Sequence, residues 1–211
     1  MAISLKDALN ELPLVAILRG VTPEEVIAIA DVLVEQGYKV IEVPLNSPRP
    51  YESIKLLSDK YGENLVIGAG TVVSKEQVDQ VELAGGRIII SPHADVEIIK
   101  YSKAKNLYCV PGFFNPTEAY AAIHAGADSL KLFPADTLGP KGLKAMSVVL
   151  PDIQILPVGG VSPDTMQAFI DAGASGFGLG SGLYKAGMSV EQVKHNAMAY
   201  VQGYKSTLTV H

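Results

Sequence analysis

The sequence has a single cysteine, Cys109, and no tryptophan. A lone cysteine excludes a disulfide within the chain, so a small disulfide-stabilised secreted protein is not expected. No apolar run approaches the ~20 residues of a membrane-spanning helix. The first residues also lack the basic and apolar regions of a signal peptide. We therefore expect a cytoplasmic protein in which Cys109 is a small buried side chain.

Basic residues are also outnumbered, with 17 Lys and Arg against 22 Asp and Glu, for a net charge of -5. This balance argues against nucleic acid or an anionic membrane as the main partner. Apolar residues are plentiful at 48% of 211 residues, whereas charged residues make up 18%. We therefore expect one compact globular domain that spans residues 1–211.

The chain repeats one unit: a short apolar run, a turn and an amphipathic segment. Helix-start signals such as Thr22-Pro23 and Asn115-Pro116 follow several runs, and glycines such as Gly37 and Gly126 stand where helices would end. The apolar runs cover residues 12–20, 40–45, 65–72, 87–91, 106–112, 129–134, 153–160 and 176–184.

Eight such units predict a parallel sheet covered by helices and closed into a (β/α)8 TIM barrel, with an extra helix over residues 5–11. An open doubly wound sheet is the alternative. The glycines near the C-terminus do not favour a dinucleotide site, because Ser181 and Leu183 stand where G-x-G-x-x-G requires its last glycine.

One lysine, Lys131, lies inside the apolar run 129–134. Alternation along a strand places it on the face opposite Leu130 and Leu132. A buried ammonium is costly unless it is paired or loses its proton, and a lysine with a lowered pKa is a nucleophile for carbonyl carbons. Lys131 is therefore either a Schiff-base former or half of a structural ion pair.

Glu42 is the only carboxylate inside any of the eight runs. If it points into the barrel with Lys131, it could act as a general acid and base, or it could complete the structural ion pair. Arg19 ends the first run and could hold a carboxylate or phosphate, or be an ordinary surface arginine. Thr71 follows Gly70 at the end of the third run, where its hydroxyl could bond a carboxylate.

A glycine-containing segment ends each of the last two runs. Gly159-Gly160 and Gly180-Ser181 lie where barrels often bind phosphate through backbone N–H groups, although ordinary tight turns would give the same pattern. The four histidines, His93, His124, His195 and His211, lack metal-ligand spacing, and we assign no role to His93.

Several of these segments together resemble the 2-keto-3-deoxy-6-phospho-sugar-acid aldolases from about Leu12 to Tyr204. The segments are ILRG at 17–20, EVPLNSP at 42–48, GAGTV at 68–72, LKLFP at 130–134, VGGV at 158–161 and GLGS at 178–181. Gluconate-type members usually carry arginine and threonine after the Glu-x-Thr-Leu segment and threonine before the paired glycines. This sequence has Asn46, Ser47 and Val158 there, and so is similar to the galactonate branch.

The resemblance implies a class I aldolase that splits 2-dehydro-3-deoxy-6-phospho-D-galactonate into pyruvate and D-glyceraldehyde 3-phosphate. It implies Lys131 as the Schiff-base lysine, Glu42 as the general acid and base, and Arg19 and Thr71 as pyruvate-binding groups. It also implies no metal or cofactor and a homotrimeric assembly. The phosphate-binding residues implied in the same way are Gly159, Gly160, Gly180 and Ser181.

Three alternatives stay open at this point: an aldolase for the gluconate epimer, a phosphosugar epimerase on the same barrel, and a non-catalytic phosphosugar-binding protein. An epimerase would use Glu42 as base and Lys131 as electrostatic support. Apolar neighbours and Arg19 would lower the pKa of Lys131, whereas ionised Glu42 would raise it. The sequence does not decide which effect is larger.

Overall fold

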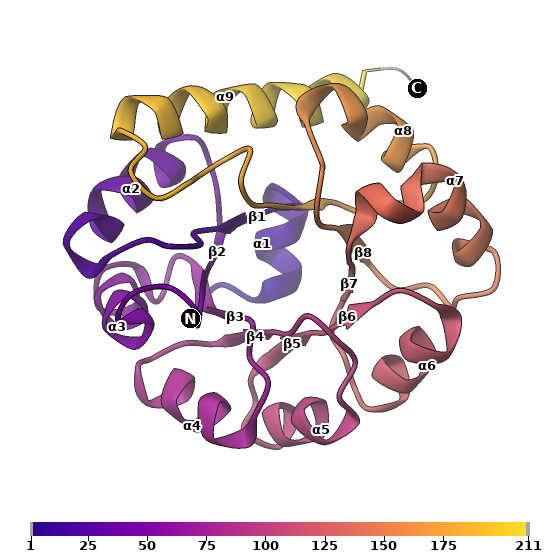
Figure 1. Ribbon diagram of the computed structural model, residues 1–211, viewed down its shortest axis with the longest axis horizontal. Helices are drawn as coiled ribbons and strands as arrows, with labels where there is room; N and C mark the ends of the chain where they lie inside the picture. The colour runs from indigo at the N-terminus through magenta and orange to yellow at the C-terminus, as the bar shows by residue number, and fades with distance from the viewer. Residues whose placement is uncertain (1, 210–211) are drawn as a thin grey trace.

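The computed structural model describes residues 2–209 and has parallel strands arranged in a ring with helices around it (Figure 1). Each strand is short and lies within or beside a predicted apolar run. The strands are β1 (Leu14–Ile17), β2 (Val40–Pro44), β3 (Val66–Gly70), β4 (Ile88–Ile90), β5 (Tyr108–Val110), β6 (Gly112–Phe113), β7 (Leu130–Leu132), β8 (Ile155–Pro157) and β9 (Phe177–Leu179).

The strands form two sheets that meet at both edges. One sheet has the order β5-β4-β3-β2-β1-β9 and the other the order β6-β7-β8. Pro111 separates β5 from β6, and its carbonyl accepts the Lys131 N–H at 2.9 Å. A parallel bridge between Val158 and Gly178 joins the other two edges. These contacts close the ring into a TIM-barrel-like α/β fold, so the open doubly wound alternative is wrong.

The helices begin and end largely at the predicted signals. Thr22 forms a capping box with Glu25 at the start of α2, and the glycines after the helices adopt positive φ, as at Gly37 (93°) and Gly126 (99°). The helices are α1 (Leu5–Glu11), α2 (Pro23–Glu35), α3 (Pro50–Tyr61), α4 (Lys75–Leu83), α5 (Val96–Ala104), α6 (Pro116–His124), α7 (Ala135–Ser147), the 3-10 helix η1 (Pro163–Thr165), α8 (Met166–Ile170) and α9 (Val190–Thr207).

Helix α7 consists of two parts. Its first turn starts at Ala135, directly after the lysine strand, and Gly139 interrupts the helix at φ 70°. Pro140 therefore opens the second part of α7, where a proline at the first helical position loses no hydrogen bond.

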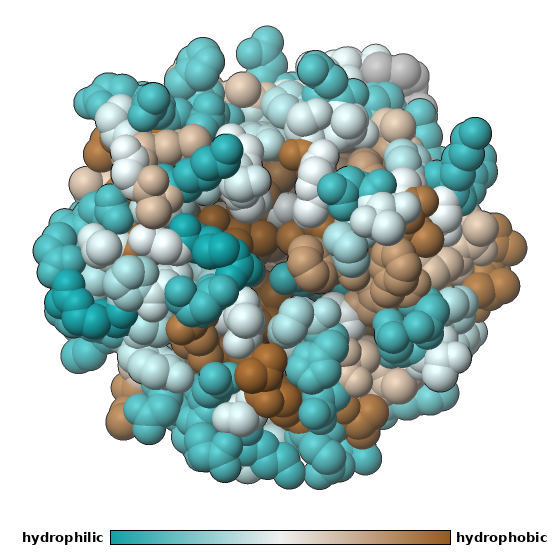
Figure 2. All heavy atoms as spheres, in the orientation of Figure 1, coloured by the Kyte–Doolittle hydropathy of each residue, from teal (hydrophilic) through white to brown (hydrophobic). Residues whose placement is uncertain are grey.

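Helix α1 lies across the middle of the ring in Figure 1, at the end that faces away from the viewer. Its buried residues Leu5, Ala8 and Leu9 pack against interior side chains such as Val15 and Val40. This end of the ring is therefore closed. The opposite face, where the strands end, is hollowed near its middle (Figure 2). Within residues 2–209, no helix is both long and apolar enough to cross a membrane.

Candidate active site

Lys131 occupies the middle of β7, opposite Gly112 of β6 and Leu156 of β8. Only 6% of the lysine is exposed, and Leu130 and Leu132 on either side are fully buried in the core outside the ring. The Nζ atom lies 5.0 Å from the centre of the Phe133 ring. Burial lowers the pKa of Lys131; the charge of Glu42 opposes this shift, and Arg19 adds to it.

Glu42 occupies the middle of β2, opposite Ile17 of β1 and Gly68 of β3. It is 1% exposed, and its Oε2 atom makes no hydrogen bond with any described residue. Burial raises the pKa of Glu42, and the positive charges of Lys131 and Arg19 oppose that shift. An unpartnered carboxylate oxygen at this depth costs stability, so its position calls for a reason beyond packing.

Lys131 and Glu42 line one small inner cavity at the centre of the ring. The Nζ atom of Lys131 does not come within 4.0 Å of either carboxylate oxygen of Glu42, so the two side chains form no direct salt bridge. Burial moves the pKa of each group toward its neutral form, which also weakens an ion pair between them. The inner cavity is lined by Val15, Ile17, Glu42, Ile90, Val110, Lys131, Leu156, Val158 and Gly178.

Arg19 follows β1 and is held by the loop after β2. Its guanidinium donates a hydrogen bond to Oδ1 of Asn46, and the adjacent Gly20 N–H donates to Oγ of Ser47 at 2.9 Å. Asn46 and Ser47 were noticed in the sequence only as departures from the gluconate-type pattern. Their contacts show that this loop orients Arg19 at the carboxyl end of the ring.

Thr71 directly follows β3 and adopts a left-handed backbone conformation with φ 59°. Such a conformation is unfavourable for a threonine and is often found at functional sites. The side chain lines neither the inner cavity nor the larger pocket described next. Thr71 is instead adjacent to Gly70, which faces the carboxylate of Glu42.

A larger pocket of about 500 Å³ opens above the inner cavity, and we call it the mouth pocket. Arg19 and Lys185 add two positive charges to its wall beside Lys131, and no carboxylate lines it. Its lining residues are Ile17, Arg19, Lys131, Phe133, Val158, Gly159, Gly160, Val161, Ser162, Gly178, Gly180, Ser181, Gly182, Tyr184, Lys185, Ala186 and Tyr200. In a protein of net charge -5, this wall selects for an anionic ligand.

The two predicted glycine loops form one side of the mouth pocket. Gly159 and Gly160 have φ of 101° and 67°, which only glycine adopts readily. At Gly180, no atom beyond its two chain neighbours lies within 4 Å of the position that a Cβ would take. Gly159, Gly160, Gly180 and Ser181 all line this pocket, and so does Lys185, which carries no motif of its own and was missed in the sequence.

Comparison with known proteins identifies the family of this chain. Residues 5–200 match the family described as "Aldolase: KDPG and KHG aldolase". The chain belongs to the KDPG and KHG aldolase family. The match covers β1, β2 and β7, and with them the positions of Arg19, Glu42 and Lys131.

Two individual proteins and one solved structure illustrate the relationship within the family. The chain is 43% identical to 2-dehydro-3-deoxy-6-phosphogalactonate aldolase of Escherichia coli (strain K12) over 94% of this chain and 98% of that protein. It is 32% identical to 2-dehydro-3-deoxy-phosphogluconate aldolase of Zymomonas mobilis subsp. mobilis (strain ATCC 31821 / ZM4 / CP4) over 68% of each chain. A structure described as native KDPGal superposes with a TM-score of 0.94 at 42% identity, covering 100% of both chains.

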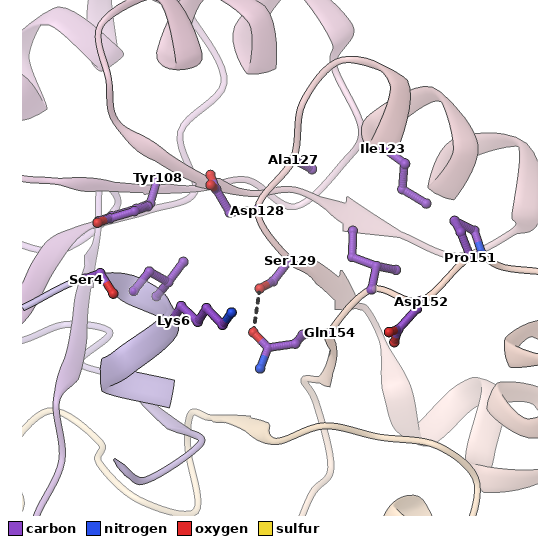
Figure 3. Close-up of a pocket in the computed structure, with 12 residues that line it drawn as sticks. Ser4, Lys6, Tyr108, Ile123, Ala127, Asp128, Ser129, Pro151, Asp152 and Gln154 are labelled. Carbon is purple, nitrogen blue, oxygen red and sulfur yellow. Dashed lines mark hydrogen bonds between the residues drawn. The ribbon is translucent and has the colours of Figure 1, made fainter. Parts of the chain in front are cut away.

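A second pocket of about 600 Å³ lies at the other end of the ring. Ser129 and Gln154 directly precede β7 and β8, and Ser129 donates a hydrogen bond to Oε1 of Gln154 at 3.4 Å (Figure 3). Lys6 of α1 points toward both residues. Chemistry in barrels of this kind gathers at the carboxyl ends of the strands, so this pocket is not the candidate active site.

Nothing in residues 2–209 groups three or more His, Cys, Asp or Glu side chains as a metal site would. His93 is half exposed after β4, with its Nε2 4.0 Å from Asp95, and it lines neither cavity of the site. His211 lies outside the described residues. Cys109 is buried, and burial raises the pKa of its thiol to about 12, so it stays protonated and unreactive.

Proposed function

We propose that this protein is a class I aldolase that cleaves 2-dehydro-3-deoxy-6-phospho-D-galactonate into pyruvate and D-glyceraldehyde 3-phosphate. The observation that carries the proposal is the mouth pocket, whose wall adds two cations, Arg19 and Lys185, and no carboxylate around the buried Lys131. Such a wall suits a substrate with a carboxylate at one end and a phosphate at the other. The higher identity to the galactonate enzyme supports the choice of epimer.

Catalysis begins when neutral Lys131 attacks the C2 carbonyl of the substrate. The burial that lowers the pKa of Lys131 increases the fraction of the amine that can attack. A carbinolamine forms, and loss of water from it gives a protonated imine. Glu42, which shares the inner cavity with Lys131, takes and returns the protons of this dehydration.

The C3–C4 bond breaks in the next step. Its electron pair moves into the imine to form an enamine, while Glu42 takes the proton of the C4 hydroxyl directly or through a water. Glyceraldehyde 3-phosphate then leaves, C3 of the enamine gains a proton, and water hydrolyses the imine to release pyruvate. General acid–base help of this kind is worth roughly 100- to 10,000-fold in rate.

The ends of the substrate are assigned from the walls of the pocket. Arg19, in the pocket wall and held by Asn46, binds the carboxylate of the pyruvate portion. Thr71, whose side chain lines neither cavity, is assigned to the same portion by the family resemblance alone. Backbone groups of Gly159, Gly160, Gly180 and Ser181 bind the phosphate, and Lys185 adds a positive charge beside them. Val158 lies between the two regions and contacts the part of the substrate near C4.

We extend the proposal to the organisation of the protein. A single domain spans residues 1–211 and carries the whole site. The extra helix α1 precedes its first strand. The family resemblance favours a homotrimer that needs no metal or cofactor. A cytoplasmic location is favoured by the lone, buried Cys109.

Borohydride trapping with labelled pyruvate tests the proposal. Reduction should fix the label on Lys131 in the wild-type protein and fix none in Lys131→Ala. An epimerase would form no imine, and a binding protein would release no pyruvate in a lactate dehydrogenase-coupled assay. Absence of label on Lys131, or absence of pyruvate release from the galactonate substrate, would overturn the proposal.

A further inference from the structure

One tyrosine of α9, Tyr200, contacts both glycine loops of the mouth pocket. Its hydroxyl donates a hydrogen bond to the carbonyl of Val161 in the loop after β8, at 2.9 Å. The same hydroxyl lies 2.1 Å from the position that a Cβ on Gly182 would take, in the loop after β9. Tyr200 is only 5% exposed, so packing holds its ring in this position.

The strands themselves provide little to set the distance between these loops. Strands β8 and β9 belong to different sheets. A bridge between Val158 and Gly178, and a hydrogen bond from the Ser175 N–H to the Ile155 carbonyl at 2.9 Å, join the two segments. Backbone N–H groups from both loops must nevertheless converge on one anion if they are to bind it together. The Tyr200 hydroxyl touches both loops and is placed to set the distance between them.

Gly182 shows how close this contact is. Its φ lies outside the left-handed region, so backbone conformation does not require glycine at position 182. The requirement is steric, because a side chain there would meet the Tyr200 hydroxyl at 2.1 Å and the Cζ atom at 3.2 Å. Burial also raises the pKa of Tyr200, which keeps the hydroxyl protonated as a donor to Val161.

We propose that Tyr200 is a positioning residue that sets the spacing of the two glycine loops and thereby the affinity for the phosphate group of the substrate. The inference rests on the proposed function, in which these loops bind phosphate. Tyr200 touches the loops and acts through them. It should therefore influence phosphate-dependent binding and leave the chemistry at Lys131 unchanged.

The first test replaces only the hydroxyl, with Tyr200→Phe. Loss of one hydrogen bond should raise KM for the phosphorylated substrate about three- to tenfold and weaken inhibition by inorganic phosphate by a similar factor. Exchange of the C3 protons of pyruvate, which needs Lys131 but no phosphate site, should stay at the wild-type rate. That exchange also shows that the variant is folded.

Tyr204→Phe is the matched control. Tyr204 lies one turn further along α9, and its hydroxyl makes no hydrogen bond with the described residues, so KM should not change. An unchanged KM and phosphate inhibition constant in Tyr200→Phe would overturn the inference. If the wild-type protein itself fails to cleave the substrate, the proposed function fails instead, and the two failures are thus distinguishable.

A double-mutant cycle tests the steric part of the relationship. Gly182→Ala should raise KM more than Tyr200→Phe does, because the new Cβ pushes against the hydroxyl. Adding Tyr200→Phe to Gly182→Ala should recover part of that loss, because the atom in closest contact has been removed. Simple additivity of the two changes in KM would contradict the assigned role of Tyr200.

Discussion

The carboxylate of Glu42 occupies the space that any side chain at Gly70 would need. A Cβ at position 70 would lie 1.5 Å from Oε2 and 2.4 Å from Cδ of Glu42. Gly70 ends β3, beside the strand that carries Glu42, and is paired with Pro44. A glycine at this position is therefore what allows the buried carboxylate to remain in the inner cavity with Lys131.

Gly70→Ala should consequently displace Glu42 and slow turnover. We expect kcat for aldol cleavage to fall about 100-fold or more, the range for loss of a general acid–base group. Steady-state kinetics on the galactonate substrate would measure this. In a Glu42→Gln background, Gly70→Ala should lower kcat little further, because the carboxylate that it displaces is already absent. An equal fall in both backgrounds would show that Gly70 acts in some other way.

Lys131→Met should abolish turnover and stabilise the protein. Burial disfavours the ammonium form, and a methionine of similar shape removes that cost. Thermal denaturation should show a rise in Tm of about 2–4 °C for each kcal/mol gained. Because the folded pKa of Lys131 lies below its unfolded value, this gain should be present at neutral pH and shrink as pH approaches the ordinary value of 10.5.

Lys141→Met is the control for that stability measurement. Lys141 is exposed at the start of the second part of α7, so its replacement should leave Tm and turnover unchanged. A loss of stability in Lys131→Met would mean that the ammonium is compensated inside the folded protein, contrary to the direction of its pKa shift.

The pH dependence of imine formation should reveal which charges act on Lys131. The neutral amine is the form that attacks, so the rate of trapping with pyruvate should rise with pH and reach half its maximum below 10.5. Arg19→Gln should move this midpoint to higher pH, because the charge of Arg19 lowers the pKa of Lys131. Glu42→Gln should move it to lower pH, because the charge of Glu42 raises that pKa.

Glu97→Gln is a suitable control for the pH profiles, since Glu97 is exposed on α5 and pairs with Lys75. Its midpoint should match that of the wild-type protein. Shifts of the Arg19 and Glu42 variants in the same direction would contradict the arrangement of charges around the inner cavity.

Lys185→Gln should weaken the binding of phosphorylated substrate. The side chain lines the mouth pocket beside the glycine loops, so its charge attracts the phosphate. We expect KM to rise about three- to thirtyfold, as for loss of one charge-assisted hydrogen bond, and the effect to diminish at high salt. Lys194→Gln, which removes a surface ion pair with Glu35, should leave KM unchanged at both salt concentrations.

Val158→Thr should relax the discrimination between the two C4 epimers. Val158 lines both the inner cavity and the mouth pocket, and a hydroxyl there adds a hydrogen-bonding group where the gluconate-type members have threonine. The ratio of kcat/KM values should move toward the gluconate epimer by about tenfold. Val149→Thr, exposed after α7 and outside both cavities, is the control and should preserve the ratio.

Much of the fold was predictable because its signals are local. Periodicity, helix caps such as Thr22 and helix-end glycines such as Gly37 depend on a few neighbouring residues. The start of α7 was harder to predict from the sequence, because the first turn has no capping side chain and Gly139 interrupts the helix. The bridge between Val158 and Gly178 that closes the ring joins residues distant in the chain, so its position was seen only in the structure.

The sequence by itself determined which groups could carry the chemistry, since a lysine and a glutamate inside apolar strands admit few interpretations. Only the tertiary structure decided their state. The pKa of Lys131 falls because burial outweighs the charge of Glu42, and depth of burial depends on the closed ring as a whole. The contacts of Arg19 with Asn46, Glu42 with Gly70 and Tyr200 with both glycine loops likewise join residues that the chain separates.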